Sequence, residues 1–461
     1  MSARTDIPAA RRVVIIGGGF AGAVTALHLI AEATEPLELT IVEPAAALGR
    51  GIAYATTEPE HVVNGLAGSF ALDRERPERF LRWLEDRVAA GEWTPPAGVA
   101  IAASSPPRAL YGAYVAQELE GTARRAADRI VLATGLHRRE TALGAGLDAH
   151  PGYVRDVFAP AAFGDLSRAA HVLILGTGLT MLDALISAER AGFRGHYTVV
   201  SRRGLLVEPR RDVPAWPGIS GDDRLPATAG EVLAWVRRER RAVREASADW
   251  QSLPPLFRAR TAAIWAGLDD GERARLLKRL VPFWNLAQHR AAPSSYRWLE
   301  RVRAQGRLTV LAGTLSRIEA DDRSLGDSRL RALIRPRGAR ELRTVEADRV
   351  LSALAYEFDW TRLDDPLVRR LLARGLVTAH PLRLGIAADP SSLGVVGADG
   401  TPSRHLFAIG HPLRGALWEA SSIREQFDQA QRFARQQFAG RAHPSATPAP
   451  RETARLMETT Q

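Results

Sequence analysis

Two stretches of the chain share one pattern: a short apolar run, then glycines, then a longer apolar stretch. Residues 13–16 (VVII) have the β-branched composition of a strand buried on both faces, and residues 21–31 follow as a helix that packs on it. Residues 172–175 (VLIL) and the helical stretch up to about residue 191 repeat this arrangement. The pattern predicts an α/β protein with two Rossmann-like units.

The first apolar stretch, residues 13–31, contains no charged residue and follows two arginines. A membrane span or a secretion signal is the alternative, since about 18 apolar residues can cross a bilayer. Three consecutive glycines at 17–19 interrupt the stretch, as do the polar Thr25 and His28. We therefore interpret it as strand, loop and helix, and expect a cytoplasmic protein without a membrane partner.

Gly17, Gly19 and Gly22 occupy the three positions of Gly-x-Gly-x-x-Gly. The first glycine makes the tight turn, the second lets the backbone approach a pyrophosphate, and the third packs the helix on the strand. Glu43 ends the next predicted strand, where an acid accepts hydrogen bonds from ribose hydroxyls. The helix start offers backbone N–H groups to the anion, and these belong to Phe20 and Ala21.

The second loop lacks the third glycine, because Met181 stands in its place. The strand that follows, residues 197–200, ends in Ser201, Arg202 and Arg203 instead of an acid. An acid would repel a 2′-phosphate, whereas Ser and Arg can bind it, so we predict NADPH rather than NADH. The alternative is that both arginines are merely solvated. The expected backbone contacts are Gly176, Thr177, Gly178, Leu179 and Thr180.

Between the two units, residues 129–135 form a predicted strand that ends in Ala-Thr-Gly. Two dinucleotide loops with such a strand between them are typical of two-dinucleotide-binding flavoproteins, with FAD bound first and NAD(P)H second. Thr134 and Gly135 are therefore further expected FAD contacts. We place the FAD domain at residues 1–165 and 345–440, and the NAD(P)H domain at 166–344.

Five further segments carry a resemblance to a known family: residues 49–54 with 61–64, 107–114, 176–183 with 201–204, 283–293, and 410–419. They resemble the FAD/NAD(P)-binding monooxygenase-like family that includes bacterial FAD-dependent urate hydroxylase and the nitrosuccinate-forming aspartate N-monooxygenase. The likeness spans about residues 12–435. It implies FAD and NADPH (or NADH) as cofactors, with Asn64, Gly410 and Trp418 near the flavin.

An anionic substrate would suit the arginines of these segments, which can bind it through paired hydrogen bonds. Candidate substrate contacts are Arg108, Arg290 and Arg414. His289 is either a substrate or nicotinamide contact, together with Arg290, or a structural residue, and we expect no metal site around it.

Two segments depart from the family pattern. Only residues 120–127 separate a predicted helix from the Ala-Thr-Gly strand, where related flavoproteins have a small β-meander. Residues 350–355 lack the glycine that usually ends a strand returning to FAD. A helical insertion is expected near residues 228–303, where Thr228 and Glu231 match a capping box. Residues 441–461 have the composition of a disordered tail.

The composition narrows the chemistry. The chain of 461 residues contains 62 Lys and Arg against 52 Asp and Glu, but Lys278 is the single lysine and arginines interleave with acids, so we expect no nucleic-acid partner. Lys278 lies outside any Walker A motif. There is no cysteine, which excludes a redox dithiol, an iron–sulfur cluster and a Cys-rich zinc site.

What remains is a flavin that passes electrons from NAD(P)H to an acceptor other than a dithiol. The resemblance favours dioxygen, and hence an FAD-dependent monooxygenase that hydroxylates a small anionic substrate. The leading expectation is urate, and the alternative is N-hydroxylation of aspartate or another amino acid. A different class of function is an FAD- and NADP-binding protein without hydroxylase activity, such as a sensor or an accessory reductase.

Overall fold

The computed structural model describes residues 11–35, 37–43, 48–72, 76–120, 129–137, 147–159, 161–218, 224–320, 329–354 and 356–438. The predicted disordered tail at 441–461 lies outside these residues, as does nearly all of the short connection at 120–127.

The first sheet has the order β11-β12-β3-β1-β2. Its strands β1, β2, β3 and β12 run parallel, and only β11 is antiparallel to its neighbour. Their bounds are β1 Arg11–Ile16, β2 Leu37–Val42, β3 Arg129–Leu132, β11 Gly394–Val396 and β12 Pro402–Ala408. Val13 and Ile15 of β1 are fully buried, and the apolar run seen in the sequence is an interior strand of this sheet, between β3 and β2.

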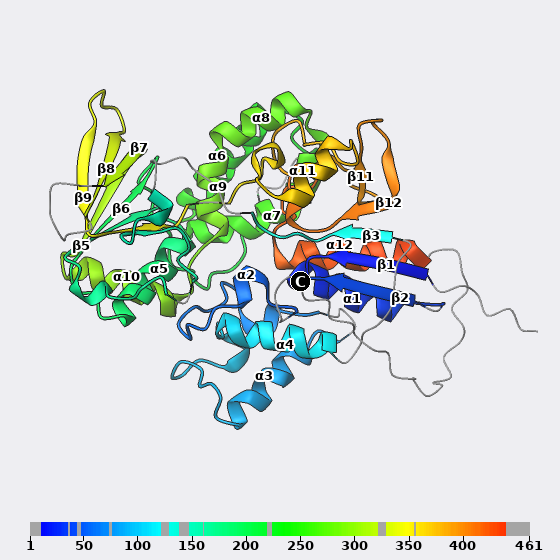
Figure 1. The fold of residues 1–461 in the computed structure, drawn as a ribbon, viewed down its shortest axis with the longest axis horizontal. Coiled ribbons are helices and arrows are strands. Elements are labelled where there is room, and N and C mark those ends of the chain that lie inside the picture. The colour runs from blue at the N-terminus through cyan, green and yellow to red at the C-terminus, as the bar shows by residue number, and fades with distance from the viewer. Residues whose placement is uncertain are drawn as a thin grey trace, which may run out of the picture.

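Helix α1, Phe20–Glu32, packs against both α12, Ile423–Phe438, and α4, Arg108–Glu120. The apolar stretch 13–31 is thus divided between a strand and a helix, as expected. None of the helices in the described ranges combines the length and the apolar composition that a membrane span needs. The short α2, Gly51–Tyr54, and α3, Arg79–Ala89, lie beside α4 in Figure 1.

The second sheet has the order β4-β10-β5-β6-β7-β8-β9. β4, β10, β5, β6 and β7 are parallel, and β7, β8 and β9 continue as an antiparallel meander. Helices α5, Leu179–Arg190, and α10, Pro293–Ala304, share its apolar core. The strands are β4 Tyr153–Val154, β5 His171–Leu175, β6 His196–Ser201, β7 Leu308–Ala320, β8 Leu330–Pro336, β9 Arg343–Ala347 and β10 Arg349–Ser352.

The sheets do not divide where the sequence analysis placed the domain boundaries. Boundaries at residues 165 and 345 would assign β4 and β10 to the FAD domain, yet both strands pair within the second sheet. Val350 and Leu351 of β10 are fully buried beside β5. The burial of these apolar side chains explains why β10 pairs within the second sheet. The chain therefore passes into the second unit earlier, and leaves it later, than predicted.

Four helices form an insertion between β6 and α10: α6 Ala229–Glu245, α7 Leu253–Gly267, α8 Asp270–Arg279 and α9 Val281–Gln288. Thr228 accepts a hydrogen bond from the Glu231 N–H at 3.1 Å, which confirms the predicted helix start. The Glu231 carboxylate instead accepts from the Ala227 N–H at 2.7 Å, one residue earlier than in a standard capping box. Figure 1 places these helices between the two sheets, with α11, Pro366–Ala373, near α8.

Candidate dinucleotide and substrate sites

The glycines of the first loop are required for different structural reasons. Gly17 has φ +103°, and a Cβ there would lie 2.3 Å from the Ala133 carbonyl oxygen. A Cβ on Gly22 would lie 1.9 Å from the Gly17 carbonyl oxygen. A Cβ on Gly19 would meet nothing closer than the Gly51 Cα, at 3.4 Å. Packing within the protein thus requires Gly17 and Gly22, whereas Gly19 leaves its backbone accessible to a ligand.

The same loop offers donors that suit a pyrophosphate. Helix α1 begins after Gly19 without a side-chain cap, so its first N–H groups and its positive dipole end face the loop. Arg50 precedes Gly51 beside this loop, and its buried Nε has no hydrogen-bond partner among the described residues. An unpartnered buried guanidinium N–H next to a helix N-terminus fits a phosphate ligand.

The remaining predicted FAD contacts gather at the carboxyl edge of the first sheet, because the four parallel strands all end there. Glu43 follows β2, and its Oε2 accepts a hydrogen bond from the Gly18 N–H at 2.6 Å. Thr134 and Gly135 follow β3, and the φ of Gly135 is +72°. Gly410 follows β12 with φ +82°, and its N–H donates to the Gln429 side chain at 2.8 Å.

The second loop repeats the geometry of the first. Gly176 has φ +116°, and a Cβ there would lie 2.4 Å from the Ala353 carbonyl oxygen. A Cβ on Gly178 would meet nothing within 4 Å, and α5 begins after it without a side-chain cap. Met181, in place of the third glycine, is fully buried in the core of this unit. Ala353 belongs to the segment that lacks the usual glycine, yet its backbone still approaches the loop closely.

The predicted 2′-phosphate contacts differ in how firmly they are held. The Ser201 Oγ accepts hydrogen bonds from the Thr177 hydroxyl at 3.0 Å and from the Gly204 N–H at 3.1 Å, so it fixes the turn after β6. Arg202 is exposed. The guanidinium of Arg203 lies 5.3 Å from the centre of the Phe283 ring on α9.

Arg108 is engaged elsewhere and has little capacity left for a substrate. Its Nη1 and Nη2 donate to the Asp183 carboxylate at 2.9 and 3.4 Å, and its Nε donates to the Val62 carbonyl at 3.0 Å. Asp183 lies on α5 and is only 5% exposed. These contacts join α4 of the first unit to α5 of the second, and a substrate contact at Arg108 stays a prediction. The buried His61 supports this junction through the Asp183 carbonyl and the Ser187 hydroxyl, both at 3.1 Å from its Nε2.

Arg414 lies among aromatic rings. Its guanidinium is 4.6 Å from the centre of the Phe358 ring and 5.2 Å from that of Trp418, and its Nη1 donates to the Ser421 hydroxyl at 2.9 Å. Within the described ranges no carboxylate forms an ion pair with it, and desolvation lowers its pKa. The buried Trp265 packs on Trp418 with a ring separation of 4.8 Å.

His289 and Arg290 follow α9 directly. His289 is partly exposed. The protein around its ring still desolvates it and so lowers its pKa, with repulsion from Arg414 and Arg258 adding to the effect and Glu419 opposing it. Desolvation also lowers the pKa of Arg290 to about 10, with repulsion from Arg210, Arg258 and Arg211 adding to it. The buried Nε of Arg290 has no hydrogen-bond partner among the described residues.

Three more residues of this region were absent from the sequence-based candidates: Arg210, Arg258 and Gln288. The N–H of Arg210 donates to the Ala291 carbonyl at 2.8 Å, which brings Arg210 beside Arg290. Arg258 donates to the Gln288 Oε1 at 2.6 Å, while the buried Nε2 of Gln288 has no partner among the described residues. We call Arg210, Arg258, Arg290 and Gln288 the arginine cluster.

Asn64 connects the arginine cluster to the first unit. Its carbonyl accepts a hydrogen bond from Arg210 Nη1 at 2.6 Å, and Arg210 Nη2 also donates to the Ser105 hydroxyl at 3.1 Å. A metal is not indicated anywhere in the described residues, where no group of three or more His, Cys, Asp and Glu could hold one. The arrangement instead provides donors for an anion: the half-buried Arg210 and Arg290, the exposed Arg258 and the buried Gln288.

The two loops, each at the carboxyl edge of its own parallel sheet and each followed by an uncapped helix, define a protein with two dinucleotide-binding units. Residues 14–146 match a family model described as FAD-NAD(P)-binding. No curated protein matches the chain at a significant level.

Several solved structures share the fold over nearly the whole chain. Ornithine hydroxylase from Pseudomonas aeruginosa, in its reduced form, is 15% identical with a TM-score of 0.59, covering 93% of this chain and 99% of that one. Ornithine N-hydroxylase from Kutzneria sp. 744 is 13% identical with a TM-score of 0.57 over 93% and 99%. The cadaverine monooxygenase of desferrioxamine biosynthesis from Erwinia amylovora is 12% identical with a TM-score of 0.57 over 96% and 100%.

These similarities confirm the predicted fold class, an α/β protein with two dinucleotide-binding domains. At such identities they establish the fold alone. None of these structures is a urate hydroxylase, so the expected link to urate and purine metabolism gains no support from them.

Proposed function

We propose that this protein is an FAD-dependent, NAD(P)H-consuming monooxygenase that hydroxylates the amine nitrogen of a small anionic substrate. The observation that carries the proposal is the arginine cluster, whose buried donors Arg290 Nε and Gln288 Nε2 lie beside His289 in a protein with two dinucleotide loops. The alternative from the sequence, amino-acid N-hydroxylation, thus replaces urate hydroxylation as the leading function.

The residues present fit both cofactors. Gly17, Gly19, Gly22 and the start of α1 would hold the FAD pyrophosphate with Arg50, and Glu43 would bind its ribose after exchanging the Gly18 N–H for ribose hydroxyls. Gly176, Gly178 and the start of α5 would hold the pyrophosphate of NAD(P)H. Arg202, exposed at the end of β6, would bind a 2′-phosphate, which favours NADPH. Bound FAD would supply the redox chemistry with dioxygen.

The chain's own side chains would bind and orient the substrate. Arg290 and Gln288 would donate hydrogen bonds to a carboxylate, and Arg258 and Arg210 would add positive charge around it. Arg414, which lies on Trp418 and Phe358 and close enough to His289 to repel its charged form, would contact the substrate or the flavin.

His289 is suited to orient the substrate amine. A histidine whose pKa is lowered is neutral at physiological pH and is a weak base. In that form the His289 ring can accept a hydrogen bond from the substrate amine. Glu419, which accepts a hydrogen bond from Trp284 Nε1 at 2.9 Å, lies close enough to oppose the lowering of this pKa.

The test is a substrate screen with purified protein and FAD. NADPH oxidation in air is measured with amine-bearing mono- and dicarboxylates, with diamines that lack a carboxylate, and with urate. We expect an amine that bears a carboxylate to stimulate NADPH oxidation and to yield an N-oxygenated product by mass spectrometry. If urate alone is hydroxylated, the N-hydroxylation proposal fails. If flavin binds and no compound stimulates oxidation, the protein is a dinucleotide-binding protein without hydroxylase activity.

A further inference from the structure

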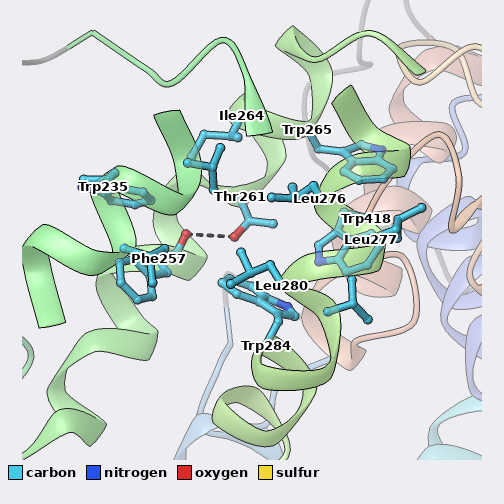
Figure 2. A pocket seen from close by; sticks show the side chains of 13 residues that line it. Trp235, Phe257, Thr261, Ile264, Trp265, Leu276, Leu277, Leu280, Trp284 and Trp418 are labelled. Atoms are coloured by element: carbon cyan, nitrogen blue, oxygen red, sulfur yellow. Dashed lines mark hydrogen bonds between the residues drawn. The ribbon is translucent and has the colours of Figure 1, made fainter. Parts of the chain in front are cut away.

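The helical insertion lines a small, partly open cavity of about 40 Å³. Figure 2 shows side chains of α6, α7, α8 and α9 around it, with Trp418 of the first unit at one side. Its lining includes Thr261, Ile264, Trp265, Leu276, Trp284 and Trp418. The dinucleotide loops and the arginine cluster do not contribute to this lining.

The cavity wall is apolar. The Thr261 hydroxyl and the indole N–H groups of Trp265 and Trp284 donate hydrogen bonds to other protein groups. The Thr261 hydroxyl, which is the only non-aromatic polar side chain in the lining, donates to the Phe257 carbonyl at 2.8 Å (Figure 2). The indole N–H of Trp265 donates to the Gly415 carbonyl at 2.8 Å, and that of Trp284 to the Glu419 carboxylate. A buried water needs about two to four polar partners. We therefore expect the cavity to be dry.

The size of the cavity limits its occupant. One water molecule needs roughly 10–15 Å³ of such volume. Dry apolar cavities bind small apolar guests such as xenon. A volume of about 40 Å³ accommodates a diatomic gas molecule but not an amino acid.

The position of the cavity connects it to the first unit. Trp418 lines the cavity, packs on Trp265 at 4.8 Å, and has the Arg414 guanidinium 5.2 Å from its ring centre. The same tryptophan follows the Gly410 turn at the carboxyl edge of the FAD sheet. The cavity thus lies one side chain away from residues that we assign to the flavin and substrate sites.

We propose that this cavity binds dioxygen on its way to the flavin, an inference that rests on the proposed monooxygenase function. A monooxygenase has to admit dioxygen while it keeps water from the reacting centre. A dry apolar cavity admits dioxygen, because dioxygen is a small apolar molecule. It excludes water, because water would lose its hydrogen bonds there. Trp418 would separate this store of dioxygen from the substrate side.

The first experiment detects the gas site without any catalysis. Crystals of the FAD-bound protein are pressurised with xenon, and xenon density is expected between Ile264, Leu276 and Trp418. Leu276→Phe, which adds volume at the cavity wall, should abolish this density, whereas Leu276→Met, which nearly conserves volume, should retain it. The absence of xenon in the wild-type cavity, or ordered waters in its place, would overturn the proposal.

The second experiment measures the use of dioxygen. FAD in each variant is reduced with NADPH without air and then mixed with buffers of increasing dioxygen concentration. We expect Leu276→Phe to lower the second-order rate constant of reoxidation about fivefold or more, with Leu276→Met near wild type and anaerobic reduction unchanged in both. Reoxidation of Leu276→Phe at the wild-type rate, or a raised KM for the organic substrate instead, would refute the dioxygen site. Failure of the proposed function is distinguishable, because it would abolish hydroxylation in every variant and leave the xenon density unchanged.

Discussion

Gly17 and Gly19 lie two residues apart in one loop, and the structure separates their purposes. An alanine at Gly17 would place its Cβ against the Ala133 carbonyl and would force an L-residue to φ +103°. An alanine at Gly19 would make only ordinary contact with Gly51, at the loop that we expect to hold the FAD pyrophosphate.

This contrast gives a prediction for the two alanine variants. Gly19→Ala should fold normally but lose FAD affinity by about tenfold or more, because its methyl group occupies the approach to the phosphates. Gly17→Ala should lower the melting temperature whether or not FAD is present. Flavin absorbance after purification and thermal melting of the flavin-free proteins check both outcomes. Full FAD retention in Gly19→Ala would contradict the first-loop assignment.

Arg290 provides the corresponding test at the substrate site. Because its Nε has no protein partner, Arg290→Met should remove a substrate contact without breaking a strong internal one. We expect the KM for the anionic substrate to rise about tenfold or more and the KM for NADPH to stay near wild type, since hydrogen bonds to charged groups contribute roughly 1.5–3 kcal/mol.

The control for Arg290→Met is Arg211→Met. In the wild type the Arg211 guanidinium is near Arg290 but is paired with Asp249 at 2.5 Å. Arg211→Met also removes one positive charge from this region and should leave both KM values close to wild type. A rise in the KM for NADPH in Arg290→Met would instead assign the arginine cluster to the cofactor.

His411 makes acid stability predictable. Desolvation, together with repulsion from Arg414 and His137, lowers the pKa of His411 from 6.5 to about 3. As the pH falls below 6.5, the unfolded chain takes up a proton at this residue that the folded chain does not, so stability is lost until about pH 3.

A variant without this histidine should therefore resist acid better. Between pH 7 and pH 5, the free energy of unfolding of His411→Asn should fall by roughly 1–2 kcal/mol less than that of the wild type in urea titrations. His405→Asn, at an exposed position of β12, is the control and should follow the wild-type pH dependence. Parallel curves for His411→Asn and the wild type would contradict this account of His411.

At the scale of elements, a largely buried ion pair joins the two dinucleotide units. Arg108 on α4 and Asp183 on α5 are both largely buried, with side chains 15% and 7% exposed, so each compensates a charge that would otherwise be desolvated alone. His61, between Thr56 and Ser187, extends the same contact. The orientation of α5 relative to the first unit thus depends on a few polar residues.

Removal of one partner should be costly. Arg108→Met is expected to lower the free energy of unfolding by about 3 kcal/mol, because the buried Asp183 carboxylate loses its counter-ion. Arg82→Met, which breaks the exposed pair with Glu78, should cost less than about 1 kcal/mol. Urea denaturation measures both. Unchanged stability of Arg108→Met together with a raised substrate KM would restore the substrate role that the sequence suggested for Arg108.

Across the whole molecule, the elements predicted from local patterns are those whose signal lies within a few residues. The two glycine loops, the strands before them and the Thr228 cap belong to this group, because turn geometry and helix capping depend on neighbouring residues. The positions of β4 and β10 could not be inferred in this way. Each is short, and its pairing depends on strands more than a hundred residues away or on the other side of the insertion.

In the candidate site, too, some residues have a local sequence signal, whereas others are brought together only by the fold. His289 and Arg290 could be singled out by the likeness of their segment to a family, but the residues around them could not. Arg210 reaches Arg290 through the bridge between Pro209 and Ala291, and Arg258 reaches Gln288 from a different helix of the insertion. No spacing in the sequence encodes these contacts, since they arise from packing of the insertion between the two units.

In the proposed reaction, the protein uses two dinucleotides to place one oxygen atom on a small amine-bearing anion. The most direct measurement uses isotopically labelled dioxygen with the FAD-bound protein, NADPH and the carboxylate-bearing amine that best stimulates NADPH oxidation. We predict one labelled oxygen atom on the product nitrogen for each NADPH consumed. Unlabelled product, or NADPH oxidation that yields hydrogen peroxide and no hydroxylated amine with any substrate, would contradict the account.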